Sequence, residues 1–122
     1  MTIYVDDMRH HYRRLILSHM IADTDEELHH MAQRIGVAHR WFQGDHYDVC
    51  QEMKAKAIVA GAVQIKWMQA SAMIQLRAAT KADLLPPPNE AYALYRQWRK
   101  DHAQPNQEQA TLHDGLQRRL SP

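Results

Sequence analysis

The sequence predicts one small α/β domain: a sheet of three or four strands flanked by helices, with a further helix after a proline break. Short runs of β-branched and aromatic residues alternate with amphipathic stretches, which is the pattern of an α/β layer architecture. The length of 122 residues fits a single domain with its own core. Residues 86–88 are all proline and cannot continue a helix. We therefore divide the chain into an α/β domain (1–85), a docked C-terminal helix (86–102) and a flexible tail (103–122).

Four stretches are expected to be strands. Residues 3–5 are β-branched or aromatic and end at two acidic residues, and residues 15–22 are apolar except at two positions. A basic connection, residues 8–14, joins these two strands. Residues 37–43 are expected to form the third strand, and residues 62–65 the fourth.

The best-defined helix is expected over residues 24–35. Thr24 and Glu27 have the spacing of a capping box, and Gly36 supplies the left-handed residue that ends a helix. The apolar side chains recur at helical spacing on one face, at Leu28, Met31, Ala32 and Ile35. Ala-, Gln- and Met-rich composition predicts two more helices, over 50–60 and 67–79.

The C-terminal helix is expected to begin with Asn89 as its N-cap. Its apolar positions again follow helical spacing, at Ala91, Leu94, Tyr95 and Trp98. This face predicts a helix that packs against the body of the domain.

Composition restricts the class of protein. The 15 basic and 14 acidic residues give a net charge of +1, which argues against a protein that coats polyanions generally. The single cysteine, Cys50, forms no internal disulfide and cannot build a thiolate zinc site, which favours a cytoplasmic location. No run of residues approaches the roughly 18 apolar positions of a membrane span, so we expect no membrane partner.

Six short blocks occur in one order along the chain. They are Ile3-Tyr4-Val5-Asp6-Asp7, His19 with Ala22-Asp23, Glu27-Leu28-His29, Trp41-Phe42-Gln43, His46-Tyr47-Asp48 and Gly61-Ala62-Val63. Together they resemble a small bacterial and phage family, domain of unknown function 4031, over residues 2–77. The resemblance implies no activity, but it implies that certain polar residues belong to a shared pattern: Asp6, Asp7, His19, Asp23, His29, His46 and Asp48. The chain departs from the family by a short connection between Gln43 and His46 and by the segment after Pro86.

A metal site is the first functional hypothesis. Acidic and histidine side chains follow the expected strands, at Asp6, Asp7, Asp23, His46 and Asp48. If the strands run parallel, these side chains meet in one crevice at the carboxyl ends. Carboxylates with imidazole suit a divalent cation, Mg²⁺ or Mn²⁺, which polarises a phosphoryl oxygen and activates water. The alternative is structural: Asp23 or Thr24 caps one helix, Asp48 caps the next, and Asp6 and Asp7 end an edge strand.

A phosphate site is the second hypothesis. The basic connection places cationic and imidazole side chains on the same rim, at Arg9, His10, His11, Arg13 and Arg14, and guanidinium groups bind phosphate oxygens in pairs. Tyr12 lies among them and can stack on a base. The alternative is a solvated loop.

Four other residues are expected to have structural roles. His19 is expected to be a hydrogen-bonded, partly buried side chain outside the metal cluster. His29 and His30 are adjacent on a helix and therefore point about 100° apart. Cys50 is expected in the capping region of a helix, although a nucleophilic role is conceivable there.

The leading functional hypothesis is a binding site for a phosphate-bearing ligand, either a nucleotide or a nucleic acid. Metal-dependent phosphoester hydrolysis is the chemistry expected if a divalent cation binds. The alternative is a non-catalytic accessory or inhibitor protein of phage or bacterial origin that acts by contacting another protein. The sequence alone assigns no catalytic residue and no oligomeric state.

Overall fold

A computed structural model describes residues 2–103 of the chain. Its elements are β1 (Ile3–Val5), β2 (His10–Tyr12), β3 (Leu15–Ala22), α1 (Asp25–Ile35), the 3-10 helix η1 (His39–Trp41), β4 (Tyr47–Cys50), α2 (Gln51–Val59), β5 (Val63–Gln64), α3 (Trp67–Thr80) and α4 (Pro88–Asp101). The α/β class is confirmed, but the sheet has five strands rather than three or four. The tail expected over 103–122 lies outside the described residues except for Ala103.

The long strand β3 is the centre of the sheet, and it is paired along both of its edges. Leu17 and Met20 both pair with β4, which therefore occupies one edge. Leu17 also pairs with β2 and Met20 with β1, so β1 and β2 share the opposite edge. These three pairings of β3 are antiparallel. On its other edge, β1 also pairs with β5, and this pairing is parallel. The parallel arrangement that the shared crevice required is therefore wrong for β1 and β3, because a connection as short as residues 6–14 supports a hairpin rather than a crossover. Strand β4 was not among the expected strands, and it too is antiparallel to β3.

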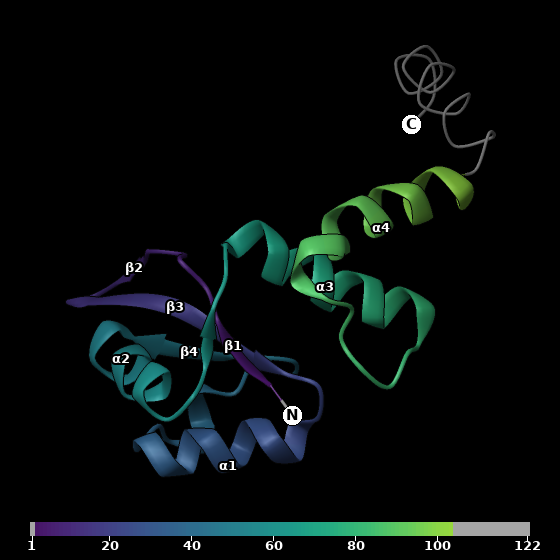
Figure 1. The fold of residues 1–122 in the computed structure, drawn as a ribbon. Helices are drawn as coiled ribbons and strands as arrows, with labels where there is room; N and C mark the ends of the chain where they lie inside the picture. The colour runs from purple at the N-terminus through teal and green to yellow at the C-terminus, as the bar shows by residue number, and fades with distance from the viewer. Residues whose placement is uncertain (1, 104–122) are drawn as a thin grey trace, which may run out of the picture.

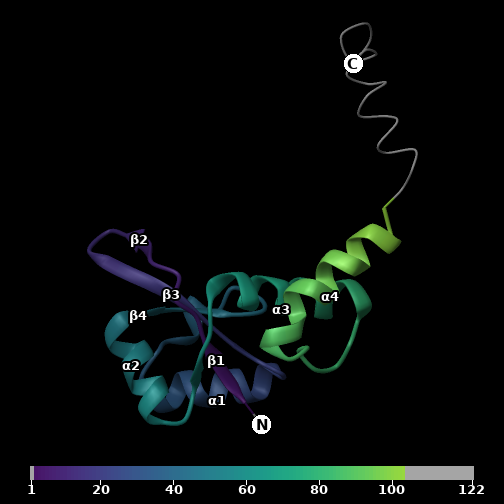
Figure 2. The same cartoon turned by 45° about the horizontal axis from the view of Figure 1, so that its top comes forward.

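The sheet separates two hydrophobic cores (Figures 1 and 2). The first lies between one face of the sheet and helices α1 and α2, and includes Val5, Met20 and Leu28. The second lies between the other face and helices α3 and α4, and includes Ile21, Met73 and Ala91. Because successive residues of β3 alternate between the faces, Ile21 and Met20 belong to different cores.

Helix α1 confirms the capping prediction. Thr24 is its N-cap and accepts a hydrogen bond from the Glu27 N–H at 3.2 Å. Gly36 ends the helix in the left-handed region, at φ 86°. The four predicted apolar positions of this helix are all buried.

Two predicted elements differ in the structure. Residues 37–43 do not form a strand; they contain η1, and Phe42 makes only an isolated bridge with Tyr47. The aromatic side chains that suggested a strand pack against the first core instead, through Trp41 and Phe42. The basic connection, expected to be irregular, contains β2.

Helix α4 packs along α3, and it extends away from the sheet (Figure 1). Its N-cap is Pro87 rather than Asn89, because Pro88 at the first helical position already has the required φ. Ala91 is fully buried against α3, and the Tyr95 hydroxyl donates to the Gln75 side chain at 2.8 Å. Within residues 2–103, no helix has the length and apolar character needed to cross a membrane.

Candidate metal centre

Asp6 is a buried carboxylate at a gap in the sheet. The chain leaves the edge of β3 after β1 and returns to it at β2, so the intervening residues do not pair as a strand. The Asp6 side chain fills this gap: its Oδ1 accepts the N–H of Met8 at 3.1 Å and the N–H of His19 at 2.8 Å. Its Oδ2 lies 2.8 Å from Nδ1 of His19. Asp6 is therefore fully buried with both oxygens bonded.

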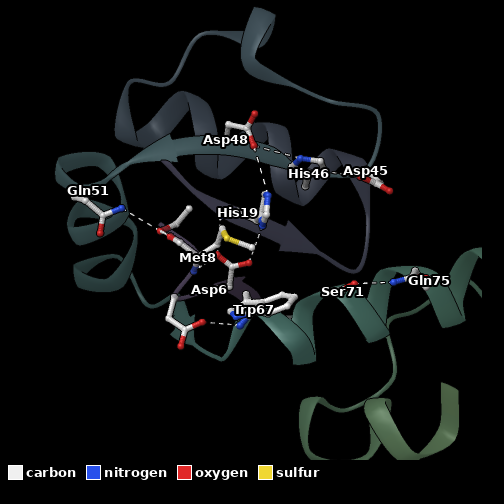
Figure 3. Close-up of polar contacts among 12 residues, drawn as sticks. Asp6, Met8, His19, Asp45, His46, Asp48, Gln51, Trp67, Ser71 and Gln75 are labelled. Carbon is white, nitrogen blue, oxygen red and sulfur yellow. Dashed lines mark hydrogen bonds and ion pairs between the residues drawn. The ribbon is translucent and has the colours of Figure 1, made fainter. Parts of the chain in front are cut away.

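His19, His46 and Asp48 are brought together by strand register. His19 on β3 lies directly opposite Asp48 on β4. His46 precedes Asp48 by two residues, which places it on the same side of the chain. The two imidazole rings meet edge to face, with centroids 4.8 Å apart. Figure 3 shows His19 between Asp6 and Asp48, with His46 beside it.

Each of these imidazoles is held by a carboxylate at Nδ1. Asp6 holds His19, and Asp45 lies 2.6 Å from Nδ1 of His46. An ionised carboxylate only accepts, so Nδ1 carries the proton in both rings and Nε2 is left as a free ligand atom in the neutral imidazole. Both Nε2 atoms face the same Oδ1 of Asp48, at 3.9 Å from His19 and 3.3 Å from His46. Carboxylates placed in this way orient metal-binding histidines and raise their basicity.

The donor atoms of His19, His46 and Asp48 all lie within 4.8 Å of one another. Ligands at about 2.1 Å from a tetrahedral ion lie about 3.4 Å apart. The pair of His46 and Asp48 already has this spacing, at 3.3 Å, and Nε2 of His19 lies 3.9 Å from the same Asp48 oxygen. Two imidazole nitrogens with one carboxylate oxygen suit Mn²⁺, Zn²⁺ or Fe²⁺ better than Mg²⁺, which prefers oxygen ligands.

The pKa of His19 is raised above its ordinary value. The hydrogen bond that His19 Nδ1–H donates to Asp6 is the largest cause of the raised pKa, and burial opposes it. The negative charges of Asp6, Asp48 and Asp45 add to the increase in pKa. A site that favours the positively charged imidazole by these charges also attracts a cation that replaces the proton.

The five residues expected to form the metal site are divided by the structure. His46 and Asp48 lie next to each other, with Nε2 of His46 3.3 Å from Oδ1 of Asp48. Asp6 lies nearby but contacts only His19 of the cluster, through the hydrogen bond at Nδ1. Asp7 lies elsewhere: its Oδ1 accepts the N–H of Trp67, the first residue of α3, at 2.7 Å. Asp23 accepts the N–H of Leu85 at 2.9 Å.

The sequence reasoning left His19 out of the cluster. It is hydrogen-bonded and partly buried, as expected. However, its ring faces Asp48 across the strand pair. The signal that could have found it is a single histidine on the otherwise apolar face of Leu17 and Ile21. Asp48 is not a helix cap either, because the N-cap of α2 is Cys50.

Two hollows lie beside the cluster on this face of the sheet. The first, which we call the apolar hollow, has a volume of about 300 Å³ and is lined by His19 and His46 together with Ile21, Trp67 and Ile74. The second, which we call the basic hollow, has a volume of about 480 Å³. Its lining includes His10, Tyr12, Arg13, Arg40, Trp41 and Asp48.

The expected phosphate-binding residues are also divided. His10 and Arg13 line the basic hollow, whereas Arg9, His11 and Arg14 are exposed on the hairpin outside it. Arg40 and Trp41 of η1 complete the hollow, and the sequence reasoning did not select either of them.

The remaining candidates have structural positions. His29 lies 2.7 Å from the Tyr47 hydroxyl through Nδ1, and its ring packs edge-on against Phe42. His30 is exposed on the next position of α1. Cys50 is a free thiol at the N-cap of α2, without a side-chain capping bond.

The fold and the cluster define a small α/β protein in which a sheet presents two carboxylate-held imidazoles and an aspartate on one face. The chain belongs to the family described as protein of unknown function DUF4031, whose model matches residues 3–78. The resemblance seen in the sequence is thus confirmed. The match includes every residue of the cluster and ends before α4. No curated protein and no solved structure matches the chain.

Proposed function

We propose that His19, His46 and Asp48 bind a divalent cation and that the protein uses it to hydrolyse a phosphoester. The observation that carries the proposal is the bonding of both Nδ1 atoms to carboxylates, Asp6 and Asp45, which turns both Nε2 atoms toward one oxygen of Asp48. In the neutral imidazoles both Nε2 atoms and the Asp48 oxygen present lone pairs to one another, and a divalent cation between the three donor atoms would replace their mutual repulsion with coordinate bonds.

The roles of the residues follow from their positions. Held by His19, His46 and Asp48, a divalent cation would supply a polarised phosphoryl oxygen and a water molecule of lowered pKa, whose proton would leave to solvent. The water oxygen then bonds to phosphorus, the ester P–O bond breaks, and its electron pair leaves with the alcohol oxygen, which takes up a proton. Arg13 and Arg40 bind the other phosphate oxygens from the basic hollow.

Of the two cations expected from the sequence, Mn²⁺ fits the donor set better than Mg²⁺ because two of the three donors are imidazoles. A cytoplasmic location is part of the proposal. It is supported by the free thiol of Cys50, which suits a reducing compartment.

Calorimetric titration of the purified protein with MnCl₂, ZnCl₂ and MgCl₂ tests the metal site. We expect His19→Ala and His46→Ala to weaken Mn²⁺ and Zn²⁺ binding at least about 10-fold. His30→Ala is the matched control, since His30 is exposed on α1 outside the cluster. Equal binding by all four proteins, or no binding by the wild type, would overturn the proposal.

Hydrolysis of bis(p-nitrophenyl) phosphate in the presence of Mn²⁺ tests the reaction. If the protein binds the metal but hydrolyses neither this nor any other phosphodiester, the proposed hydrolase activity is wrong and only the proposed metal binding stands. If no cation binds either, the alternative of a non-catalytic protein that contacts a partner protein takes its place.

A further inference from the structure

We infer that the basic hollow binds one nucleotide unit, with its phosphate on Arg13 and Arg40 and its base against Tyr12 and Trp41. This inference rests on the proposed function, because it names the substrate class of the same site. The juxtaposition that carries it is a pair of guanidinium groups and a pair of aromatic rings around a hollow that shares Asp48 with the metal cluster.

The hollow lies on the same face of the sheet as the cluster. On β2, His10 pairs with Leu17, and on β4, Cys50 pairs with Leu17 from the other side. Tyr12 and Asp48 each lie two residues from these positions, so their side chains point to the face that carries His19. The volume of about 480 Å³ falls in the range of about 300–1,000 Å³ that small-ligand sites occupy. A ligand in this hollow therefore reaches the cluster without crossing the sheet.

The charge of the hollow favours an anion. Arg13 and Arg40 line it, and Asp48 is its single acidic residue. Among the described residues neither guanidinium takes part in an ion pair, since the four ion pairs there all involve His19 or His46. Two guanidinium groups without carboxylate partners are suited to phosphate, which each can bind through two N–H groups.

The aromatic residues favour a flat group beside that phosphate. The rings of Tyr12 and Trp41 meet at 88° with centroids 6.0 Å apart, so they form two walls of a corner. Tyr12 is 42% exposed, and the Arg13 guanidinium lies over its ring at 5.4 Å from the centroid, so a base that stacks on Tyr12 lies beside that guanidinium or replaces it. Any nucleobase can stack on such aromatic side chains, because every base has a flat aromatic face. Inorganic phosphate has no flat group that could stack on these rings. We therefore expect the hollow to bind a nucleotide more tightly than inorganic phosphate.

The backbone of Arg13 gives a further indication. Arg13 lies in the two-residue turn between β2 and β3 with φ 56°, a left-handed conformation that favours glycine or asparagine. An arginine at this position costs conformational energy. Its guanidinium lies over the Tyr12 ring, 5.4 Å from the ring centroid, and this cation–π contact offsets part of that cost. Binding of a phosphate by the Arg13 guanidinium provides a further reason for an arginine here.

The turn also makes a sharp test possible. Arg13→Gly removes the guanidinium while relieving the backbone, so we expect an unchanged or higher melting temperature. Arg40→Ala removes the second guanidinium. Arg34→Ala, an exposed arginine on α1 with the same charge, is the control for net charge. All proteins are titrated in EDTA with AMP, with a labelled ten-nucleotide oligothymidylate, and with inorganic phosphate.

We expect the wild type to bind AMP or the oligonucleotide more tightly than inorganic phosphate. Arg13→Gly and Arg40→Ala should each weaken that binding at least about 10-fold, whereas Arg34→Ala should not. Tyr12→Leu should weaken binding of AMP and leave binding of inorganic phosphate unchanged. Equal affinity for AMP and the oligonucleotide identifies a free nucleotide as the ligand. Tighter and strongly salt-dependent binding of the oligonucleotide identifies a single strand.

Absence of binding by the wild type overturns the inference, as does equal binding of AMP and inorganic phosphate. Its failure is distinguishable from that of the proposed function. If Mn²⁺ binds and its binding depends on His46, but no nucleotide binds, only the nucleotide inference is wrong. If nucleotide binds in EDTA, also in His46→Ala, but Mn²⁺ does not bind, only the proposed metal site is wrong.

Discussion

The carboxylate of Asp6 holds His19 at two points, since Oδ1 accepts its backbone N–H at 2.8 Å and Oδ2 lies 2.8 Å from its Nδ1. One side chain therefore completes the edge of β3 and sets the orientation of an imidazole in the candidate metal centre. The two roles can be separated by substitution, because they use different oxygens.

Asp6→Asn should keep the fold and impair the metal centre. The asparagine Oδ1 can still accept the N–H groups of Met8 and His19. Its amide N–H now donates to Nδ1 of His19, so the proton of that ring moves to Nε2. A protonated Nε2 cannot coordinate the metal. We expect Mn²⁺ affinity to fall by about 10- to 100-fold in a calorimetric titration. Unchanged affinity would show that His19 is not a ligand.

Asp6→Ala should destabilise the protein much more than Asp6→Asn. It leaves two backbone N–H groups without their acceptor at a fully buried position and removes the partner of His19. We expect a loss of about 3 kcal/mol in the free energy of unfolding, measured in urea. A loss similar to that in Asp6→Asn would mean that water satisfies these groups.

The stability of the metal-free protein should fall as the pH rises. The pKa of His19 is raised above 6.5 in the folded protein, chiefly by Asp6, so the folded state binds more protons than the unfolded state above that pH. This contribution to stability is complete below pH 6.5 and is lost as the pH rises through the folded pKa. Urea unfolding in EDTA from about pH 6 to about pH 8 measures the slope. His19→Gln should flatten it, whereas His30→Gln should not.

Asp7→Ala should affect α3 and leave metal binding unchanged. Its carboxylate accepts the N–H of Trp67 at the first position of that helix. We expect a loss of about 1 kcal/mol, as for other caps, with wild-type affinity for Mn²⁺. A large loss of Mn²⁺ affinity would instead support the sequence-based prediction that Asp7 is part of the metal site.

Removal of α4 should lower stability. Ala91 of α4 belongs to the second core, and Tyr95 packs against it. Deletion of residues 86–122 should cost about 2 kcal/mol or more through the apolar surface it exposes on α3. Deletion of residues 104–122 alone is the control, and thermal unfolding compares the two. Identical melting curves would show that α4 contributes nothing to the fold.

Local signals in the sequence predicted local structure well. The capping box at Thr24 and the glycine at position 36 fixed the ends of α1, because both act within one turn. Residues 37–43 have the composition of a strand, yet tertiary packing of Trp41 and Phe42 decided their structure. The hairpin at β2 depends on a left-handed Arg13, a residue type that gives no sign of a turn.

The candidate site was predicted in part, and for a reason that was wrong. Asp6, His46 and Asp48 were grouped by an assumed parallel sheet. They meet instead because an antiparallel register sets His19 opposite Asp48, and that register is not readable from either strand alone. Asp7 and Asp23 also follow strands, but their carboxylates accept backbone N–H groups of distant segments. Only the tertiary structure distinguishes these from the carboxylates that hold an imidazole.

The outer edge of β2 has a consequence for self-association. Within the described residues β2 pairs with β3 alone, and its three residues are all exposed. Such a strand offers free N–H and C=O groups to a strand of another molecule, which is the first step of edge-to-edge aggregation. Arg9, Arg13 and Arg14 flank this edge, and like charges on two copies repel each other. Arg13, which lines the basic hollow, thus also belongs to the group of arginines that keeps the sheets of two molecules from joining.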